Sequence, residues 1–305
     1  QLHEIIVVND ASTDKTVELA MLGGATVIES GELPKGWNGK PWACQQGAEA
    51  ATGNLLLFLD ADVRIQPGAM RKLRTLVSTS TRDSVYSIYP HHQILKIYEE
   101  LSSYFNSLML AGINSFGVKS AAGQNSALFG QVLLLDKQLY HKIGGHSGVK
   151  DKVLENFYLS EQLKAKGIAC HCLLGKGLIS MRMFPDGFLE LWLSWKKGFV
   201  SGASNVDGTA LFFSSLWVTA GMLSIASVFC IGAESAPKNY TLFALIAYSI
   251  NVLACHWAFR IAGSFSWLNA LIFPISLLFY QALFFTALSD KFRGKKINWK
   301  GRMVK

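Results

Sequence analysis

The amino-acid sequence predicts an α/β domain followed by an apolar, helix-rich region. Two observations predict the domain: short apolar runs such as HEIIVVND and NLLLFLDAD end in polar residues, and helix-like segments alternate with them. The third observation is that residues 211–289 are almost free of charge, which is typical of membrane helices. We therefore predict a folded domain over residues 1–205, a membrane region over 206–290 and a basic tail over 291–305.

Local patterns predict the elements of the first part in order. HEIIVVND is a β-branched strand, and STDKTVELAML begins a helix with Ser12 or Thr13 as N-cap and Asp14 in the first turn. ATVIES predicts a second strand, and KPWACQQGAEAAT predicts a second helix. NLLLFLDAD has the continuous apolar character of a fully buried strand in a parallel sheet. Strands that alternate with helices favour a doubly wound sheet.

Polar residues follow the strand-like runs. Asn9 and Asp10 follow the first run, and Asp60 and Asp62 follow the buried one. Ligands of open α/β sheets bind beyond the carboxyl ends of the strands. Two carboxylates one residue apart can hold a hard divalent cation against a diphosphate and neutralise charge on a departing phosphate. The alternative is structural, because Asp60 could cap a helix that begins near Pro67.

The charge balance favours a membrane over nucleic acid as the partner. Lysine and arginine outnumber aspartate and glutamate by 29 to 21, but seven of the cations fall in the final segment KFRGKKINWKGRMVK. A basic tail directly after an apolar stretch is typical of contact with anionic lipid headgroups. We therefore expect a lipid bilayer as partner and no nucleic acid.

The cysteines have no spacing typical of a metal site. The two in the segment CHC fall in a predicted strand, where alternating burial explains their spacing better than shared ligation. We predict reduced thiols at all five positions, namely Cys44, Cys170, Cys172, Cys230 and Cys255.

Five segments resemble, in the same order, the motifs of family-2 inverting glycosyltransferases of the GT-A fold. They are VVNDASTD, KGWNGKPWAC, FLDADVRIQPGAM, LYHKIGGHSGVKDKVLENFYLSEQLKAKG and SWKKGFVSGA, and the resemblance covers about residues 4–205. GWNGKPWAC is similar to the membrane-attached branch that glycosylates isoprenoid lipids. Within that branch the chain looks most like the glycosyltransferases of carotenoid synthesis, and hopanoid-associated enzymes share much of the pattern.

The resemblance implies a donor site for a nucleotide-sugar. Asp10 is expected to contact the uracil, and Asp60 and Asp62 to flank the ribose, the diphosphate and Mg²⁺ or Mn²⁺, with Asp62 as the firmer metal ligand. Lys40 would suit the donor phosphates, although a solvated lysine at a helix start is the alternative. Two tryptophans either wall this site or pack in the core, namely Trp37 and Trp42.

Two departures from the family pattern change the expectations. No segment matches the strand with which the family usually begins, so we expect a first strand, its helix and any membrane anchor ahead of Gln1. The Glu-Asp pair whose Asp accepts the proton of the attacking hydroxyl is Glu155-Asn156 here. Because an amide cannot take that proton, either Glu155 serves as base or the acceptor needs none. An ordinary helix-start acid is the alternative for Glu155.

An acceptor that needs no base would be a carboxylic acid, since a carboxyl group is already ionised near neutral pH. Three residues at an aromatic-basic motif of the family could attract that carboxylate, or could instead form an interfacial belt, namely Trp195, Lys196 and Lys197. Three residues match a region that faces the acceptor in relatives, with packing as the alternative, namely Asn125, Phe129 and Gln131. His91 and His92 favour a turn or surface position.

Three segments compete as membrane spans: 211–233, 240–259 and 267–289. Three crossings would place the basic tail opposite the cytosolic nucleotide-sugar pool, against the positive-inside rule. We favour two crossings and a re-entrant or interfacial middle segment, with a catalytic domain that faces the cytoplasm.

These observations predict an integral membrane enzyme that transfers glucose or a similar hexose from a UDP-sugar to an isoprenoid or carotenoid acid. The alternatives are a hopanoid or polyprenyl-phosphate acceptor, or a non-catalytic scaffold that keeps the fold.

Overall fold

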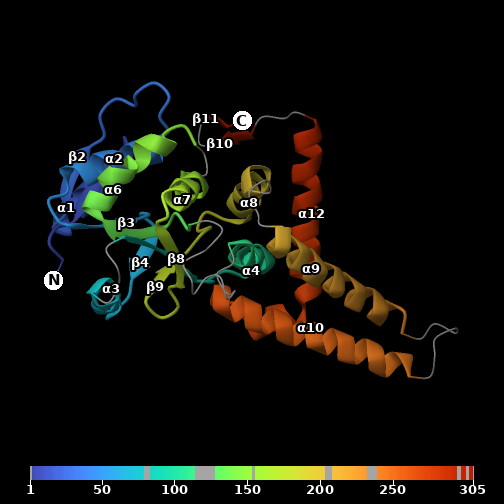
Figure 1. Cartoon of the computed structure of the whole chain (residues 1–305). Helices are drawn as coiled ribbons and strands as arrows, with labels where there is room; N and C mark the ends of the chain where they lie inside the picture. The colour runs from blue at the N-terminus through green and yellow to red at the C-terminus, as the bar shows by residue number, and fades with distance from the viewer. Residues whose placement is uncertain are drawn as a thin grey trace. The chain divides into compact units, whose positions relative to one another are not determined.

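The computed structural model describes residues 2–78, 83–113, 128–152, 155–202, 208–231, 239–293, 297–299 and 302–304 (Figure 1). The chain forms two compact units. The first comprises residues 1–61, 68–89 and 118–173, and the second comprises 62–67, 90–117 and 174–305. The second unit therefore includes three segments that the predicted 1–205 domain had contained, namely 62–67, 90–117 and 174–205, so the chain passes between the units several times.

Strands and helices alternate in the first unit as predicted. Its elements are β1 (Ile6–Asn9), α1 (Thr16–Leu22), β2 (Thr26–Glu29), α2 (Gly39–Ala50), β3 (Leu55–Leu59), α3 (Ala69–Ser78), β5 (Ser84–Tyr89), β7 (Val132–Asp136), α6 (Lys137–Ile143), the 3₁₀ turn η2 (Gly145–Val149), α7 (Glu155–Ala165) and β8 (Ala169–Leu174).

The sheets of this unit are mixed rather than all parallel. β1 pairs with β2 in parallel, and a second sheet has the order β3-β7-β5-β8, in which β3 and β5 are both antiparallel to β7. The prediction that the NLLLFLDAD strand is fully buried and parallel was therefore wrong. In the described part of the chain β3 lies at the edge of this sheet, and Leu55 and Leu59 are 47% and 40% exposed. The core lies instead around β5 and β7, whose apolar side chains are buried.

The start of α1 also differs from the prediction. The helix begins at Thr16, and neither Ser12 nor Thr13 is its N-cap. The Asp14 carboxylate accepts a hydrogen bond from the Thr16 backbone N–H at 3.0 Å, and Asn9 accepts one from the Ser12 backbone at 3.1 Å. These local bonds stabilise a turn over the residues that the sequence pattern had given to the helix.

The second unit contains a small sheet and most of the long helices. Its elements are β4 (Val63–Ile65), β6 (His91–His92), η1 (Ile97–Ser102), α4 (Ser103–Gly112), β9 (Ile179–Met181), α8 (Phe188–Gly202), α9 (Gly208–Phe229), α10 (Tyr240–Ala262), α11 (Trp267–Leu271), α12 (Phe273–Phe292), β10 (Ile297–Trp299) and β11 (Arg302–Val304).

The small sheet has the order β4-β9-β6, and it corrects the expectation for the two histidines. His91 and His92 form β6, which pairs with β9, and His92 is only 1% exposed rather than at a turn or on the surface. Burial and the neighbouring His91 lower the pKa of His92 to about 3, so its imidazole is neutral.

In the part of the chain that the structure describes, three helices are long and apolar enough to cross a membrane: Gly208–Phe229, Tyr240–Ala262 and Phe273–Asp290. The chain is therefore suited to membrane association, and Figure 1 shows α9 and α10 side by side. The middle segment is one continuous helix, whereas the third predicted segment divides into α11 and α12 at Ile272. Pro274 explains the division because it has no N–H to continue a helix. The number of crossings stays a prediction.

Candidate functional site

Lys40 joins two acidic residues of the first unit that are far apart in sequence. Its Nζ lies 2.7 Å from Asp60 Oδ1 and 3.4 Å from Glu155 Oε1, and it donates to the Gly130 carbonyl at 3.1 Å. The side chains of Lys40 and Asp60 are 41% and 32% exposed, whereas that of Glu155 is 8% exposed. One ammonium group therefore serves two carboxylates at an accessible position. We call Lys40, Asp60, Glu155 and Gly130 the Lys40 cluster.

Three elements bring the cluster together. α2 begins at Gly39, just after Asn38, whose backbone and side-chain N–H groups donate to the carbonyls of Lys150 and Lys152 at 2.7 and 3.0 Å. Asp60 follows β3 and is held where its backbone N–H donates to the Gln131 carbonyl at 2.9 Å. Glu155 opens α7. The backbone of Lys150 and Lys152 is thus hydrogen-bonded to the start of α2, which helps to hold Lys40 beside both acids.

The two carboxylates determine the charge of Lys40. Burial alone would lower the pKa of its ammonium group, but the attraction of Asp60 and Glu155 outweighs burial and raises that pKa above its ordinary value. Lys40 is therefore a permanent cation at neutral pH. One turn further along α2, burial raises the pKa of Cys44 to about 12, so this thiol is neutral and unsuited to act as a nucleophile.

Asn156 packs closely against Gly130 of the Lys40 cluster, a contact that no sequence pattern predicted. A Cβ atom on Gly130 would lie 1.8 Å from Nδ2 of Asn156, so a side chain at this position would require Asn156 to move. The same Nδ2 donates to Glu155 Oε1 at 3.3 Å. Gly130 thus lets Asn156 approach while its carbonyl accepts from Lys40. Nothing local in the sequence pointed to Gly130, because the contact joins residues 26 positions apart in the chain.

A buried polar pair supports the cluster from within the first unit. The Tyr140 hydroxyl lies 2.8 Å from Nδ1 of His146 and donates to Gln45 of α2 at 3.1 Å. Phe58 of β3 packs on the His146 ring. Burial and the charge of Lys40 lower the pKa of His146 to about 4, so its imidazole is neutral at physiological pH. No local sequence pattern pointed to Tyr140 or His146.

The other residues predicted to bind the donor, Asp10, Trp37 and Trp42, are not part of the Lys40 cluster. Asp10 is exposed directly after β1, next to Asn9, which is buried and donates to Glu29 at 2.7 Å. The rings of Trp37 and Trp42 meet edge to face with centroids 5.1 Å apart, and both side chains are partly exposed. Their contact is compatible with both interpretations, a wall of the site and packing.

Asp62 stands two residues after Asp60 along the chain, where the second unit begins. Among the described residues no group of three or more His, Cys, Asp or Glu side chains could hold a metal ion. A cation that also binds substrate phosphates needs only one or two protein carboxylates, so a two-aspartate site does not conflict with this finding. The metal role of both aspartates stays a prediction.

The residues predicted to face the acceptor are largely packed. Phe129 is 2% exposed and contacts Tyr89, whereas Oε1 of Gln131 is buried without a hydrogen-bond partner in the described part of the chain. Asn125 lies outside the described residues. The acceptor roles of these three residues stay predictions.

The aromatic-basic segment of α8 lies in the second unit. Trp195 is 9% exposed and stacks on Phe105 with ring centroids 4.7 Å apart, and Lys196 pairs with Asp290 of α12. Packing and an ion pair are thus the contacts observed for Trp195 and Lys196, and the acceptor role of these residues and of Lys197 stays a prediction.

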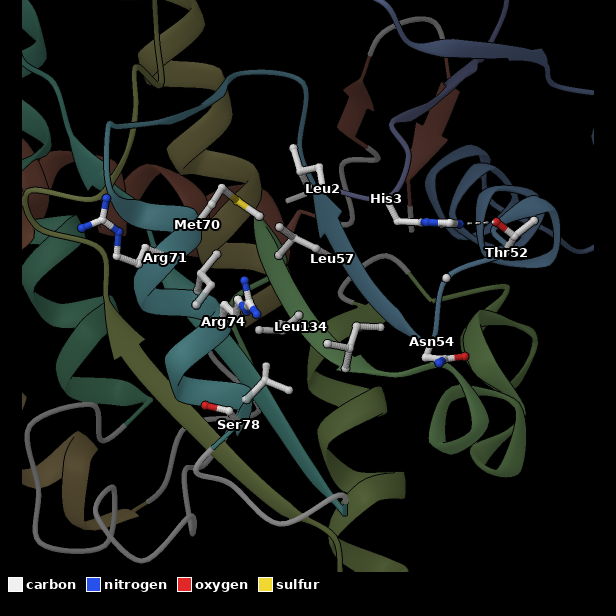
Figure 2. A pocket seen from close by; sticks show the side chains of 14 residues that line it. Leu2, His3, Thr52, Asn54, Leu57, Met70, Arg71, Arg74, Ser78 and Leu134 are labelled. Atoms are coloured by element: carbon white, nitrogen blue, oxygen red, sulfur yellow. Dashed lines mark hydrogen bonds between the residues drawn. The ribbon is translucent and has the colours of Figure 1, made fainter.

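A cavity of about 910 Å³ lies elsewhere in the first unit. Figure 2 shows Met70 of α3 facing Leu57 of β3 and Leu2, with Arg74 of the same helix near Leu134. The cavity also reaches the residues before the start of β3, whereas Asp60 follows the end of that strand. None of the residues of the Lys40 cluster lines it.

Comparison with known proteins defines the class of this protein. The family model described as glycosyl transferase family 2 matches residues 1–157, so the chain belongs to this family. The protein is therefore a glycosyltransferase. The predicted fold class, an α/β GT-A domain followed by apolar helices, is confirmed by the family together with the observed elements.

The chain is similar to particular enzymes as well. It is 28% identical to the 4,4'-diaponeurosporenoate glycosyltransferase of Staphylococcus aureus (strain USA300), over 98% of this chain and 80% of the relative. Among solved structures, the mannosyltransferase PcManGT from Pyrobaculum calidifontis, in complex with GDP-Man and Mn²⁺, has 16% identity and a TM-score of 0.47 over 96% of this chain and 79% of its own. Glucosyl-3-phosphoglycerate synthase from Mycobacterium tuberculosis, in complex with Mn²⁺, UDP and glucosyl-3-phosphoglycerate, has 18% identity and a TM-score of 0.43 over 67% and 69%.

Proposed function

We propose that this glycosyltransferase transfers glucose or a similar hexose from a UDP-sugar to the carboxylate of an isoprenoid acid, with inversion at the anomeric carbon. The observation that supports a carboxylate as the acceptor is Asn156, which lies where the family resemblance places a catalytic aspartate. An amide cannot accept a proton. A carboxylic acid with an ordinary pKa of about 4 to 5 is already ionised near neutral pH and attacks without a base.

The Staphylococcus aureus relative supports the same acceptor class, because it is named for a carotenoid carboxylate and aligns over 98% of this chain. In the proposed reaction, a carboxylate oxygen forms the bond to the anomeric carbon while the bond from that carbon to the diphosphate oxygen breaks. UDP leaves with the electron pair of that bond. The product is a glycosyl ester, and no proton has to be removed from the nucleophile.

In the proposed reaction the Lys40 cluster binds the diphosphate of the sugar donor. Its permanent ammonium group, more than a third exposed, suits the phosphates of the leaving diphosphate. Glu155 and Asp60 hold this group in place before the donor binds. Asp10 would contact the uracil from the end of β1. Trp195, Lys196 and Lys197 are the proposed acceptor contacts.

A divalent cation, Mg²⁺ or Mn²⁺, belongs to the proposal. Asp60 and Asp62 fit such an ion chemically, because carboxylates are hard oxygen ligands and Asp60 is one-third exposed. When bound, the ion would neutralise negative charge that develops on the departing diphosphate. The apolar helices would hold the enzyme in the cell membrane as a multi-pass protein, with the site facing the cytoplasmic pool of nucleotide-sugars.

The test is a transfer assay with the full chain, UDP-glucose and a carotenoid acid, in which the lipid product is identified by mass spectrometry. We expect a hexosyl product that mild alkali cleaves, as an ester requires. A chelator should abolish its formation, and Asp62→Ala should remove most of it without unfolding the protein. An alkali-stable glycoside would instead identify an alcohol acceptor such as a hopanoid, and full activity in excess chelator would refute the metal site.

Donor binding can be measured separately. Lys40→Gln should weaken UDP-glucose binding about tenfold, as expected for loss of one charge-assisted contact of 1.5 kcal/mol or so. Lys35→Gln is the matched control, because Lys35 is an exposed lysine in the segment just before α2. Equal binding by both variants would remove Lys40 from the donor site.

A further inference from the structure

Two basic side chains and a histidine of the second unit converge on the C-terminal end of α10. Arg260 lies in the last turn of this helix, and Nζ of Lys176, from the turn between β8 and β9, donates to the Arg260 carbonyl at 3.0 Å. His91 of β6 is close enough that both cations act on its imidazole, which also hydrogen-bonds to the backbone of Ile261. Three separate segments of the chain thus supply this group.

The junction that holds these residues is tightly packed. Gly263, the residue after α10, forms a bridge with His92, and a Cβ atom on it would lie 2.9 Å from the His92 carbonyl oxygen. Ser264 donates to the same carbonyl at 2.8 Å, and its hydroxyl accepts from the Ile94 backbone at 2.9 Å. The end of α10 is therefore fastened to β6, so Arg260 and His91 hold a defined position.

The positive charge of this group is not neutralised by any ion pair among the described residues. In the part of the chain that the structure describes, no carboxylate forms an ion pair with Lys176 or Arg260, and both side chains are exposed. Burial together with these two cations lowers the pKa of His91, so its ring is a neutral partner beside two charges. Like charges held close together repel, and a bound anion would relieve the repulsion.

The surroundings of the group identify the kind of anion. α10 is long and apolar enough to span a bilayer, and Arg260 stands at its end. Two tryptophans flank that end with 63% and 49% of their surface exposed, Trp257 and Trp267. Exposed tryptophan next to a basic residue at the end of an apolar helix is typical of the headgroup layer of a membrane.

We propose that Lys176 and Arg260 bind the phosphate of an anionic membrane lipid at the end of α10. The two cations would supply both the charge and the N–H donors, whereas the single N–H of the neutral His91 ring is used on the backbone of Ile261. A purely structural role for Lys176 would be to cap the Arg260 carbonyl at the end of α10. That role would not account for the charge of Arg260 or for the exposed tryptophans beside it. The proposed lipid is a constituent of the bilayer, so the inference does not depend on the sugar or the acceptor.

The experiment compares lipid retention by the full chain in nanodiscs of phosphatidylcholine with and without phosphatidylglycerol. Native mass spectrometry after transfer to a neutral detergent counts the phosphatidylglycerol that stays bound. The double variant K176Q/R260Q should bind it roughly 30-fold more weakly, as expected for two basic residues at an anionic surface. The matched control R71Q/K72Q removes two exposed cations of α3 and should retain the lipid like the unmodified protein.

Two further measurements make the result decisive. R260K keeps the charge and should retain most of the phosphatidylglycerol, which separates binding from a loss of folding. Melting temperature in pure phosphatidylcholine should be the same for both double variants. Equal retention by K176Q/R260Q and its control would overturn the proposal. Displacement of phosphatidylglycerol by millimolar inorganic phosphate, with equal stabilisation, would show an anion site for free phosphate and would overturn the lipid assignment.

Discussion

Each unit contains a cluster in which carboxylates pair with a cation, and the two clusters differ in burial and in their capacity to bind a ligand. In the second unit Glu99 is 2% exposed, and both of its oxygens are satisfied: Oε1 by Arg182 at 2.7 Å, and Oε2 by the backbone N–H groups of Leu95 and Lys96. In the Lys40 cluster one ammonium group is shared between two carboxylates, and Asp60 is a third exposed. The first arrangement leaves no capacity for a ligand, whereas the second retains a net negative charge that solvent can reach.

The comparison indicates how a structural ion pair differs from a functional one. Removing one partner of a buried carboxylate whose hydrogen-bond capacity is full destabilises the fold, since it strands a charge. A partly exposed carboxylate that shares its partner contributes little to stability and remains available to a cation or a substrate. Substitutions in the two clusters should therefore affect different properties.

The largest effect should come from the Glu99 cluster. Arg182→Ala would strand the buried Glu99 carboxylate and should lower the free energy of unfolding by about 3–5 kcal/mol. Chemical denaturation in detergent measures it. Asp60→Ala is the matched control from the Lys40 cluster. Its carboxylate is a third exposed and Lys40 keeps Glu155 as a partner, so stability should change by less than about 1 kcal/mol. Similar losses in both variants would contradict the distinction between the clusters.

The Lys40 cluster should show the reverse pattern, with a large loss of activity. Asp60→Asn keeps the shape of the side chain but removes the charge proposed to hold a cation on the diphosphate. Transfer should fall roughly 10²–10³-fold, as for loss of one preorganised electrostatic contact, while the melting temperature stays unchanged. Turnover and melting curves on one preparation test both halves. An active Asp60→Asn enzyme would show that this carboxylate is structural after all.

A third prediction concerns the packing behind the cluster. Gly130→Ala would place a methyl group 1.8 Å from the Asn156 amide nitrogen, so it should destabilise the protein by about 1–3 kcal/mol. Shortening the neighbour in Gly130→Ala/Asn156→Ala should recover most of that loss. Gly53→Ala is the control, because its added methyl group would meet nothing closer than 3.7 Å. A destabilised double variant would mean that the Asn156 contact is not the cause.

The smallest effect is expected at Glu155. If the acceptor arrives as a carboxylate, Glu155→Gln should slow transfer less than about tenfold, far below the 10²–10⁴-fold expected for loss of a general base. Asn156→Asp should not accelerate transfer, because a new anion would face an anionic acceptor. An inactive Glu155→Gln enzyme with an alkali-stable product would exclude the carboxylate acceptor and leave the glycosyltransferase assignment intact.

The sequence by itself determined the features that depend on neighbouring residues. The runs before Asn9 and Asp60 form strands, KPWACQQGAEA lies in a helix, and the nearly uncharged region forms long apolar helices. Each of these follows from side chains a few positions apart, and so does the family resemblance carried by ordered motifs. Lys40, Asp60 and Glu155 were singled out on the same basis.

The tertiary structure decided which of these residues meet and how deeply each is buried. Lys40 joins Asp60 and Glu155 in part because the backbone of residues 150–152 is hydrogen-bonded to the start of α2, and the space between Gly130 and Asn156 exists only once those segments have packed. Likewise, the strand order places β3 at a sheet edge, and packing against residues remote in sequence buries His92. Burial and ion pairing depend on distances between residues remote in the chain, and periodicity within one segment carries no information about those distances.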